Sequence, residues 1–292
     1  MSSNDPRGPV VAGVSRSPTA RCAVEWAADA AARRGRELCL VHVQEWPSGA
    51  APKDRRDEPD QAWASHYRAA GRTLLQEFKD AVAERLPGLN VTTRLEDGRP
   101  TAVLREIAEG AVLLVLGSHQ VSGPMEAVTF TTVGRSLVGH PPCPVVLVPG
   151  DAARCDPLGP VMVGVDGSAA SAPAVAFAFE EADLSRADLV AVQVQRPRHG
   201  EWPSDAHGSL VDVSEAIAGW GEKYPQVLAR QEVAIGQPAV QLAELAAAAR
   251  CLVVGSRGLG GFRGMVLGST SRTLAQLAPG PLVVVPQGAG DE

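Results

Sequence analysis

A glycine-rich stretch near the end of the chain has the residue types and spacing of a phosphate-binding loop. Gly255, Gly258 and the pair Gly268-Ser269 fit the pattern G-x2-G-x9-G-[ST]. Glycines let backbone amides approach phosphate oxygens closely, and the first amides of a helix starting after Gly268 would favour an anion. The pattern predicts a cradle for a polyphosphate, although such a loop can also be a plain strand-to-helix connection.

An acidic residue follows an apolar run in the sequence GVDGS at 164–168. Asp166 would lie at the carboxyl end of a strand, where a carboxylate can accept hydrogen bonds from ribose hydroxyls. Asp-Gly-Ser is also an ordinary turn and helix-cap sequence, so this signal is weak by itself. Other phosphate fingerprints fail: G-x-x-x-x-G-K-[ST] is absent, and Arg263 stands where G-x-G-x-x-G needs its last glycine.

The elements that would position these residues occur twice in the 292-residue chain. Residues 10–44 resemble 161–195 at a separation of 151, and 98–118 resemble 236–256 at a separation of 138, so the first copy carries 13 extra residues. Both copies end alike, with PVVLVP and PLVVVP. A stretch rich in Gly, Pro and Asp separates the copies and predicts domains at 1–150 and 158–292, joined by a linker at 151–157.

Within each copy, short β-branched runs alternate with stretches rich in Ala, Leu and Glu. In the second copy the predicted strands are Val161 to Val165, Leu189 to Val194, Gln231 to Ile235, Cys251 to Val254 and Leu282 to Val285. The pattern predicts an α/β fold: two tandem doubly wound, Rossmann-like domains, each with a five-stranded, mostly parallel sheet between helices. Ligands of such sheets bind beyond the carboxyl ends of the strands.

The GVDGS sequence, the glycine loop and the final apolar strand followed by Pro286 together resemble the universal stress protein family over nearly the whole chain, twice. The resemblance implies ATP, with or without magnesium, bound between the first and fourth strand ends. It also implies a regulatory stress-response module whose ATPase activity is at most weak. The residues it assigns are Asp166 for the ribose, the backbone of Val194 for adenine, and Gly255, Gly258, Gly268 and Ser269 for the phosphates.

The first copy departs from this pattern at the corresponding positions. Ser15-Arg16 stand in place of Asp166-Gly167, Gln120 in place of Gly258, and Thr131-Thr132 in place of Gly268-Ser269. Side chains at the glycine positions would narrow the space for phosphates. We therefore predict that the first domain does not bind ATP.

Two alternatives to a nucleotide-binding regulatory module stay open. One is an enzyme like the adenine-nucleotide alpha-hydrolases with slow ATP hydrolysis, against which the missing S-G-G-x-D-S signature argues. A hydrolase also needs a positioned base and a cation clamp, and only Arg257, Arg263 and Arg272 lie near the loop. The other is an interaction scaffold that does not bind nucleotides.

The composition disfavours several other classes. A net charge of −6 and 4% aromatic residues do not suit nucleic-acid binding, and no apolar run approaches the length of a membrane span. No secretory signal is apparent, so we expect a cytoplasmic protein. Five scattered cysteines and six dispersed histidines lack disulfide or metal-site spacing.

Two expectations concern contacts between parts of the molecule. By resemblance, the last strand, at Val283 to Val285, is an edge that joins another sheet, so the two copies would pair as an intramolecular pseudo-dimer; a homodimer is left open. The segment from Trp63 to Leu86 has apolar residues at helical spacing. It would either bind a partner or, as we favour, pack on its own sheet.

Overall fold

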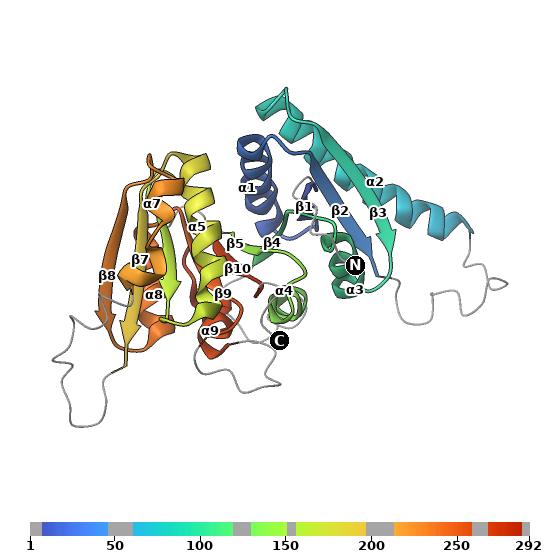
Figure 1. Ribbon diagram of the computed structural model, residues 1–292. Coiled ribbons are helices and arrows are strands. Elements are labelled where there is room, and N and C mark those ends of the chain that lie inside the picture. The colour runs from blue at the N-terminus through green and yellow to red at the C-terminus, as the bar shows by residue number, and fades with distance from the viewer. Residues whose placement is uncertain are drawn as a thin grey trace. The chain divides into compact units, whose positions relative to one another are not determined.

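The computed structural model describes residues 8–45, 61–118, 130–150, 156–196, 213–258 and 268–287. Contacts divide the chain into two compact units, Met1–Gly117 and Ser118–Glu292, and each is described by itself (Figure 1). Of the predicted linker, residues 151–155 lie outside the described part of the chain. The domain boundaries at 150 and 158 therefore stay a prediction.

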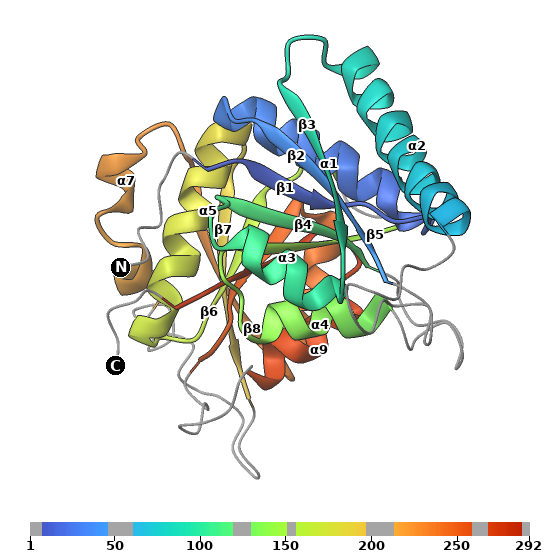
Figure 2. The ribbon, with the colours of Figure 1, turned by 90° about the vertical axis from the view of Figure 1, so that its right-hand side faces the viewer.

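Unit 1 alternates strands and helices from its first element onward. Its elements are β1 (Val10–Gly13), α1 (Thr19–Arg34), β2 (Leu38–Gln44), α2 (Gln61–Arg85), β3 (Val91–Asp97), α3 (Pro100–Ala108) and β4 (Leu113–Ser118). The strands pair in the order β3-β2-β1-β4, and all pairs are parallel. Figure 2 shows α1 and α2 along one face of these strands and α3 on the other.

Unit 2 begins with the last helix and strand of the first repeat and then contains the second repeat. Its elements are α4 (Phe130–Gly139), β5 (Val145–Pro149), β6 (Val161–Val165), η3 (Ala169–Ser171), α5 (Ala172–Ser185), β7 (Leu189–Gln195), α7 (Trp220–Lys223), β8 (Ala229–Ile235), α8 (Pro238–Leu245), η4 (Ala246–Ala248), β9 (Cys251–Gly255), α9 (Ser269–Leu277) and β10 (Leu282–Val285).

The second repeat contains the predicted five-stranded parallel sheet, in the order β10-β9-β6-β7-β8. Each predicted strand is present, with ends that differ by at most two residues. The chain enters at β6 in the middle of the sheet and winds outward in both directions, which is the doubly wound arrangement. The predicted mixed α/β fold with mostly parallel strands is therefore confirmed.

The central strands are buried on both faces, as their unbroken apolar sequences predict. In β6 Val161 and Val163 are fully buried, and β9 and β10 consist almost entirely of buried residues. Beside β10 lies β5, the last strand of the first repeat, which pairs with it in the antiparallel sense. In that pairing Val283 lies opposite Val146.

The turn after the third strand is the same in both repeats. Gly98 and Gly236 adopt φ angles of 143° and 148°, which favour glycine, and each precedes a helix that starts with proline. The Gly98 amide donates to the Gln44 carbonyl at 3.0 Å, and the Gly236 amide donates to the Gln195 carbonyl at 2.8 Å. The repeats thus share backbone geometry in detail.

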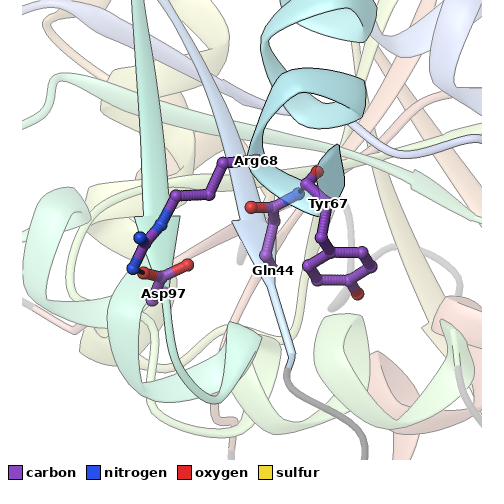
Figure 3. Close-up of polar contacts among 4 residues, drawn as sticks. All are labelled: Gln44, Tyr67, Arg68 and Asp97. Atoms are coloured by element: carbon purple, nitrogen blue, oxygen red, sulfur yellow. Dashed lines mark hydrogen bonds and ion pairs between the residues drawn. The ribbon is translucent and has the colours of Figure 1, made fainter. Parts of the chain in front are cut away.

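Helix α2, which lies within the longer part of the first repeat, packs on its own sheet. Leu74, Leu75 and Val82 are buried, and the helix contacts β2 and β3. Figure 3 shows its attachment to the strand ends: Gln44 Nε2 donates to the Tyr67 carbonyl at 2.7 Å, and Arg68 pairs with Asp97 at 2.8 Å. The alternative of a free partner-binding face is therefore not supported for these apolar residues.

Candidate functional site

A pocket of about 570 Å³ lies in the second repeat, where β6, β7 and β9 end and α9 begins. Its volume falls within the range of small-molecule sites, roughly 300–1,000 Å³. The structure brings all six predicted site residues together around this pocket: Asp166, Val194, Gly255, Gly258, Gly268 and Ser269. They come from four separate segments of the chain that the fold brings to one pocket.

The turn after β6 is organised by the carboxylate of Asp166. Its Oδ1 accepts hydrogen bonds from the Ser168 amide at 3.0 Å and the Ser168 hydroxyl at 2.6 Å, with the Ser171 hydroxyl at 3.4 Å. Gly167, inside this turn, has a φ of 79°, a conformation that glycine adopts without strain. The ordinary turn chemistry of Asp-Gly-Ser is thus present, and Asp166 also lines the pocket.

The two described ends of the glycine loop are held side by side. The Ser256 amide donates to the Val285 carbonyl at 2.8 Å, which continues the β9–β10 pairing beyond the strand. The Gly268 amide in turn donates to the Ser256 carbonyl at 3.0 Å. The loop therefore leaves and re-enters the fold at one place, and its middle, including Arg263, lies outside the described residues.

Helix α9 starts at the wall of the pocket without a side-chain cap. Gly268 is its N-cap residue in an extended conformation, and Ser269 and Thr270 line the pocket. The buried Ser271 hydroxyl donates to the Gly255 carbonyl at 2.7 Å, which fixes the start of the helix against the end of β9. No acidic residue lies in the first turn of α9, so its free amides and helix dipole can favour an anion.

The end of β7 contributes lining residues that the sequence analysis missed. From the end of β7 come Gln193, Gln195 and Arg196, beside the predicted Val194. Gln193 Oε1 is buried and has no hydrogen-bond partner in the structure. Only their place at a strand end could have pointed to these residues, because Gln and Arg there match no motif.

Helix α8 supplies an apolar part of the wall through Pro238 and Leu242. Leu242 is 4% exposed, and it lies 3.1 Å from where a Cβ on Gly164 would be. Glycine at 164 therefore leaves room for α8 to approach β6. These residues were also missed, since an apolar helix residue looks the same in sequence whether it faces a core or a ligand.

Among the lining residues that the structure describes, the charged ones are Asp166, Arg196 and Arg257. Arg257 is exposed and makes a 3.4 Å contact with the amide oxygen of Gln287. Two guanidinium groups and one carboxylate give the lining a balance that suits an anionic ligand.

The corresponding corner of the first repeat is filled by Thr19. A Cβ on Gly117 would collide with Thr19 Oγ1 and lie 3.0 Å from Thr19 Cβ. Thr19 is 3% exposed, and its hydroxyl lies 2.8 Å from that of Ser17. The equivalent of Thr19 in the second repeat is Ala170, which has no side-chain oxygen.

Other departures in the first repeat are only partly visible. His42, the counterpart of Gln193, is held by a 2.8 Å contact between its Nδ1 and the Val14 carbonyl. Gln120 lies outside the described residues, and Thr131-Thr132 lie at the start of α4, where side-chain positions are not described.

Within the described residues, His, Cys, Asp and Glu side chains nowhere gather in a group of three or more that could hold a metal ion. The cysteines described there, at 22, 39, 143 and 251, are not joined to one another by disulfide bonds. Burial raises the pKa of the Cys39 thiol, which favours the protonated form and disfavours metal ligation. Among the helices that the structure describes, none is both long and apolar enough to cross a bilayer.

Comparison with known proteins identifies the fold and its motifs. The model of the universal stress protein family matches the chain twice, at residues 6–149 and 158–286. The chain belongs to the universal stress protein family. A universal stress protein of Mycobacterium tuberculosis is 34% identical over 300 residues, covering 97% of this chain and 98% of that protein.

A universal stress protein of Mycolicibacterium smegmatis is 33% identical over 294 residues, covering 94% of this chain and 96% of that one. Among solved structures, a universal stress protein from Archaeoglobus fulgidus aligns over 100% of both chains with a TM-score of 0.67 at 16% identity. The curated relatives thus share the tandem length of this universal stress protein, and the solved structure shares its fold.

Proposed function

We propose that the protein is a regulatory module that binds ATP in the pocket of its second repeat. The observation that carries the proposal is the convergence of Asp166, the ends of the glycine loop and the start of α9 on one pocket. Three chain segments, at 166, 255–258 and 268–269, supply the residue types that ribose and phosphates need. The family resemblance, established independently over both repeats, supports the same ligand.

Each part of the nucleotide has a matching part of the wall. The phosphates would lie against the amides after Gly268 and beside Ser269, where free N–H groups favour negative charge. The ribose would meet the Asp166 carboxylate, and the adenine would contact the backbone at Val194 next to the apolar Leu242. In this arrangement the phosphates and the base would contact different segments of the chain.

The residues of this pocket fit magnesium only as an ion that the ATP phosphates also coordinate. Asp166 is the sole carboxylate among the described lining residues, and its Oδ1 already accepts hydrogen bonds from Ser168. Mg²⁺ commonly binds through one or two carboxylates together with substrate phosphates, so the ion would arrive as the ATP complex.

The hydrolase alternative has weaker support from the same residues. A positioned general base would have to lie within hydrogen-bond reach of an attacking water, and the described lining holds no histidine and no second carboxylate. We therefore propose binding with at most slow hydrolysis. A scaffold that binds no nucleotide gives no reason for these three motif segments to meet at one pocket.

The antiparallel pairing of β5 with β10 supports a further part of the proposal, that the two repeats pair through their last strands as a pseudo-dimer. Small-angle scattering that shows two separate bodies without a shared interface would count against it. Homodimerisation of the whole chain is tested by sedimentation at several concentrations, and the expected cytoplasmic location by cell fractionation.

Equilibrium dialysis of nucleotide-stripped protein with labelled ATP and magnesium tests the proposed function, with ADP formation followed by chromatography. We expect saturable binding with negligible ADP on the timescale of the experiment. Ser15→Ala, in the first repeat, is the matched control and should bind normally. Absence of saturable binding would leave the scaffold alternative, and rapid ADP formation would favour the hydrolase.

A further inference from the structure

The three glycines of the loop motif differ in the space around them. None of Gly255, Gly258 and Gly268 is among the described residues with positive φ, so backbone conformation does not demand glycine at these positions. What distinguishes them is the space that a Cβ would occupy. That space differs sharply from one glycine to the next.

At Gly258 the space is occupied by Asp166. A Cβ built on Gly258 would collide with Asp166 Oδ2 and lie 3.3 Å from Asp166 Cγ. Two hydrogen bonds restrict rotation of the carboxylate, because Oδ1 accepts one from the Ser168 amide at 3.0 Å and one from the Ser168 hydroxyl at 2.6 Å. Even alanine at 258 would therefore force the loop or the turn to move.

At Gly268 the neighbouring described atoms leave room for a methyl group. The nearest are the Ser256 carbonyl oxygen at 3.5 Å and Arg257 Cα at 3.6 Å, which are ordinary van der Waals contacts. Gly255 is intermediate, with the Arg257 carbonyl oxygen at 3.1 Å. The described packing thus leaves room for a methyl group at 268, on a residue that lines the pocket.

We propose that Gly258 is a positioning residue whose identity is dictated by Asp166, whereas Gly268 keeps space for the ligand. Asp166 and Gly258 form an interlocked pair that sets the start of the loop before any nucleotide binds. The first repeat agrees with this coupling, since it replaces both members together, with Ser15 and Gln120. A serine at the first position is shorter than aspartate and would relieve the clash.

A double-mutant cycle on the full-length chain, unfolded with urea in the absence of nucleotide, tests the pair. We expect Gly258→Ala to raise the unfolding equilibrium constant about tenfold, as overpacking does. In the Asp166→Ser background the same change should alter it less than about twofold, because contacting residues couple. An equal effect in both backgrounds would overturn the proposal.

Gly268→Ala is the matched control for stability. Alanine restricts the unfolded chain, which stabilises, and it is a poorer N-cap than glycine, which destabilises, so we expect a net change within about twofold. If Gly258→Ala does not fold, recovery of folded protein by adding Asp166→Ser supports the proposal. Failure to recover it contradicts the proposal.

The role of Gly268 rests on the proposed function and has its own readout. Gly268→Ala should weaken ATP binding about tenfold or more while its unfolding stays as in the natural chain. Unchanged affinity would contradict this role. If the natural chain binds no ATP, the proposed function and the role of Gly268 fail, but the urea cycle still decides whether Asp166 dictates Gly258.

Discussion

The two repeats carry different chemistry on nearly the same backbone. The turns at Gly98 and Gly236 match in φ and in hydrogen bonding. Yet after the first strand the first repeat has Ser15 and the second has Asp166. Beside the glycine that follows the fourth strand's apolar run, the first repeat has the buried Thr19 and the second has Ala170. A fold can thus be kept by its apolar strands while its strand ends change freely.

The β7 side of the second repeat shows the same principle. His42 is tied to the Val14 carbonyl, whereas its counterpart Gln193 has a buried Oε1 without a partner. Ser271 ties α9 to the Gly255 carbonyl, and the first repeat has Gly134 at that position. Each difference can be exchanged between the repeats, which makes the comparison testable.

Removing the carboxylate should have the largest effect. Asp166→Ala removes the proposed ribose contact and the hydrogen bonds from Ser168. Hydrogen bonds to charged groups contribute about 1.5–3 kcal/mol. We expect ATP binding to weaken roughly 10- to 100-fold in a fluorescence titration. Asp166→Asn, which keeps an acceptor oxygen, should lose less affinity; an equal or larger loss for Asn would contradict the ribose role.

Filling the corner beside Gly255 should have the next largest effect. Ala170→Thr copies Thr19 of the first repeat, and its hydroxyl would lie against the glycine that lines the pocket. We expect the added side chain to weaken ATP binding about tenfold, which corresponds to about 1.4 kcal/mol of binding free energy. The reverse change, Thr19→Ala, is the matched control and should leave ATP binding unaltered. Normal binding by Ala170→Thr would show that this corner does not matter.

Removing the hydrogen bond between α9 and the end of β9 should have a moderate effect on stability. Ser271→Ala removes the 2.7 Å hydrogen bond to the Gly255 carbonyl, whose loss should lower the free energy of unfolding by about 1 kcal/mol. Urea unfolding measures the change. Ser269→Ala changes an exposed residue two positions earlier and is the control. It should leave the unfolding free energy within about 0.5 kcal/mol of that of the natural chain. Equal losses in both variants would contradict the role of Ser271.

Much of this comparison could be predicted from the sequence, and particular residues show why. The strands of the second repeat were predictable because unbroken apolar runs such as Val161 to Val165 mark strands buried on both faces. Asp166 and the motif glycines could be singled out because they stand at fixed places in GVDGS and G-x2-G-x9-G-[ST]. Gln193 and Leu242 were not, since their part in the pocket depends on which strands and helices become neighbours.

The interlock of Asp166 with Gly258 was also beyond the sequence. The two residues are 92 positions apart, and the sequence analysis assigned both to ligand contacts. Only the position of the carboxylate shows that one excludes a side chain on the other.

Exchanging the β7 residue should have the smallest effect. Gln193→His copies His42, whose Nδ1 contacts the Val14 carbonyl. The new histidine would form the equivalent contact with the carbonyl of Val165, the counterpart of Val14, and stabilise the fold by about 0.5–1 kcal/mol. Thermal unfolding measures the gain, and His42→Gln in the first repeat should show a loss of similar size. Destabilisation by Gln193→His would indicate that the unpaired Oε1 is needed where it is.

The central claim, that only the second repeat retains a nucleotide site, is tested most directly by the binding stoichiometry. Calorimetric titration of nucleotide-stripped protein with ATP and magnesium should give one site per chain, abolished in the Asp166→Ala, Gly258→Gln double variant. Two sites per chain, or one site that survives this double change, would contradict the claimed difference between the repeats. No detectable site would contradict the nucleotide-binding function itself.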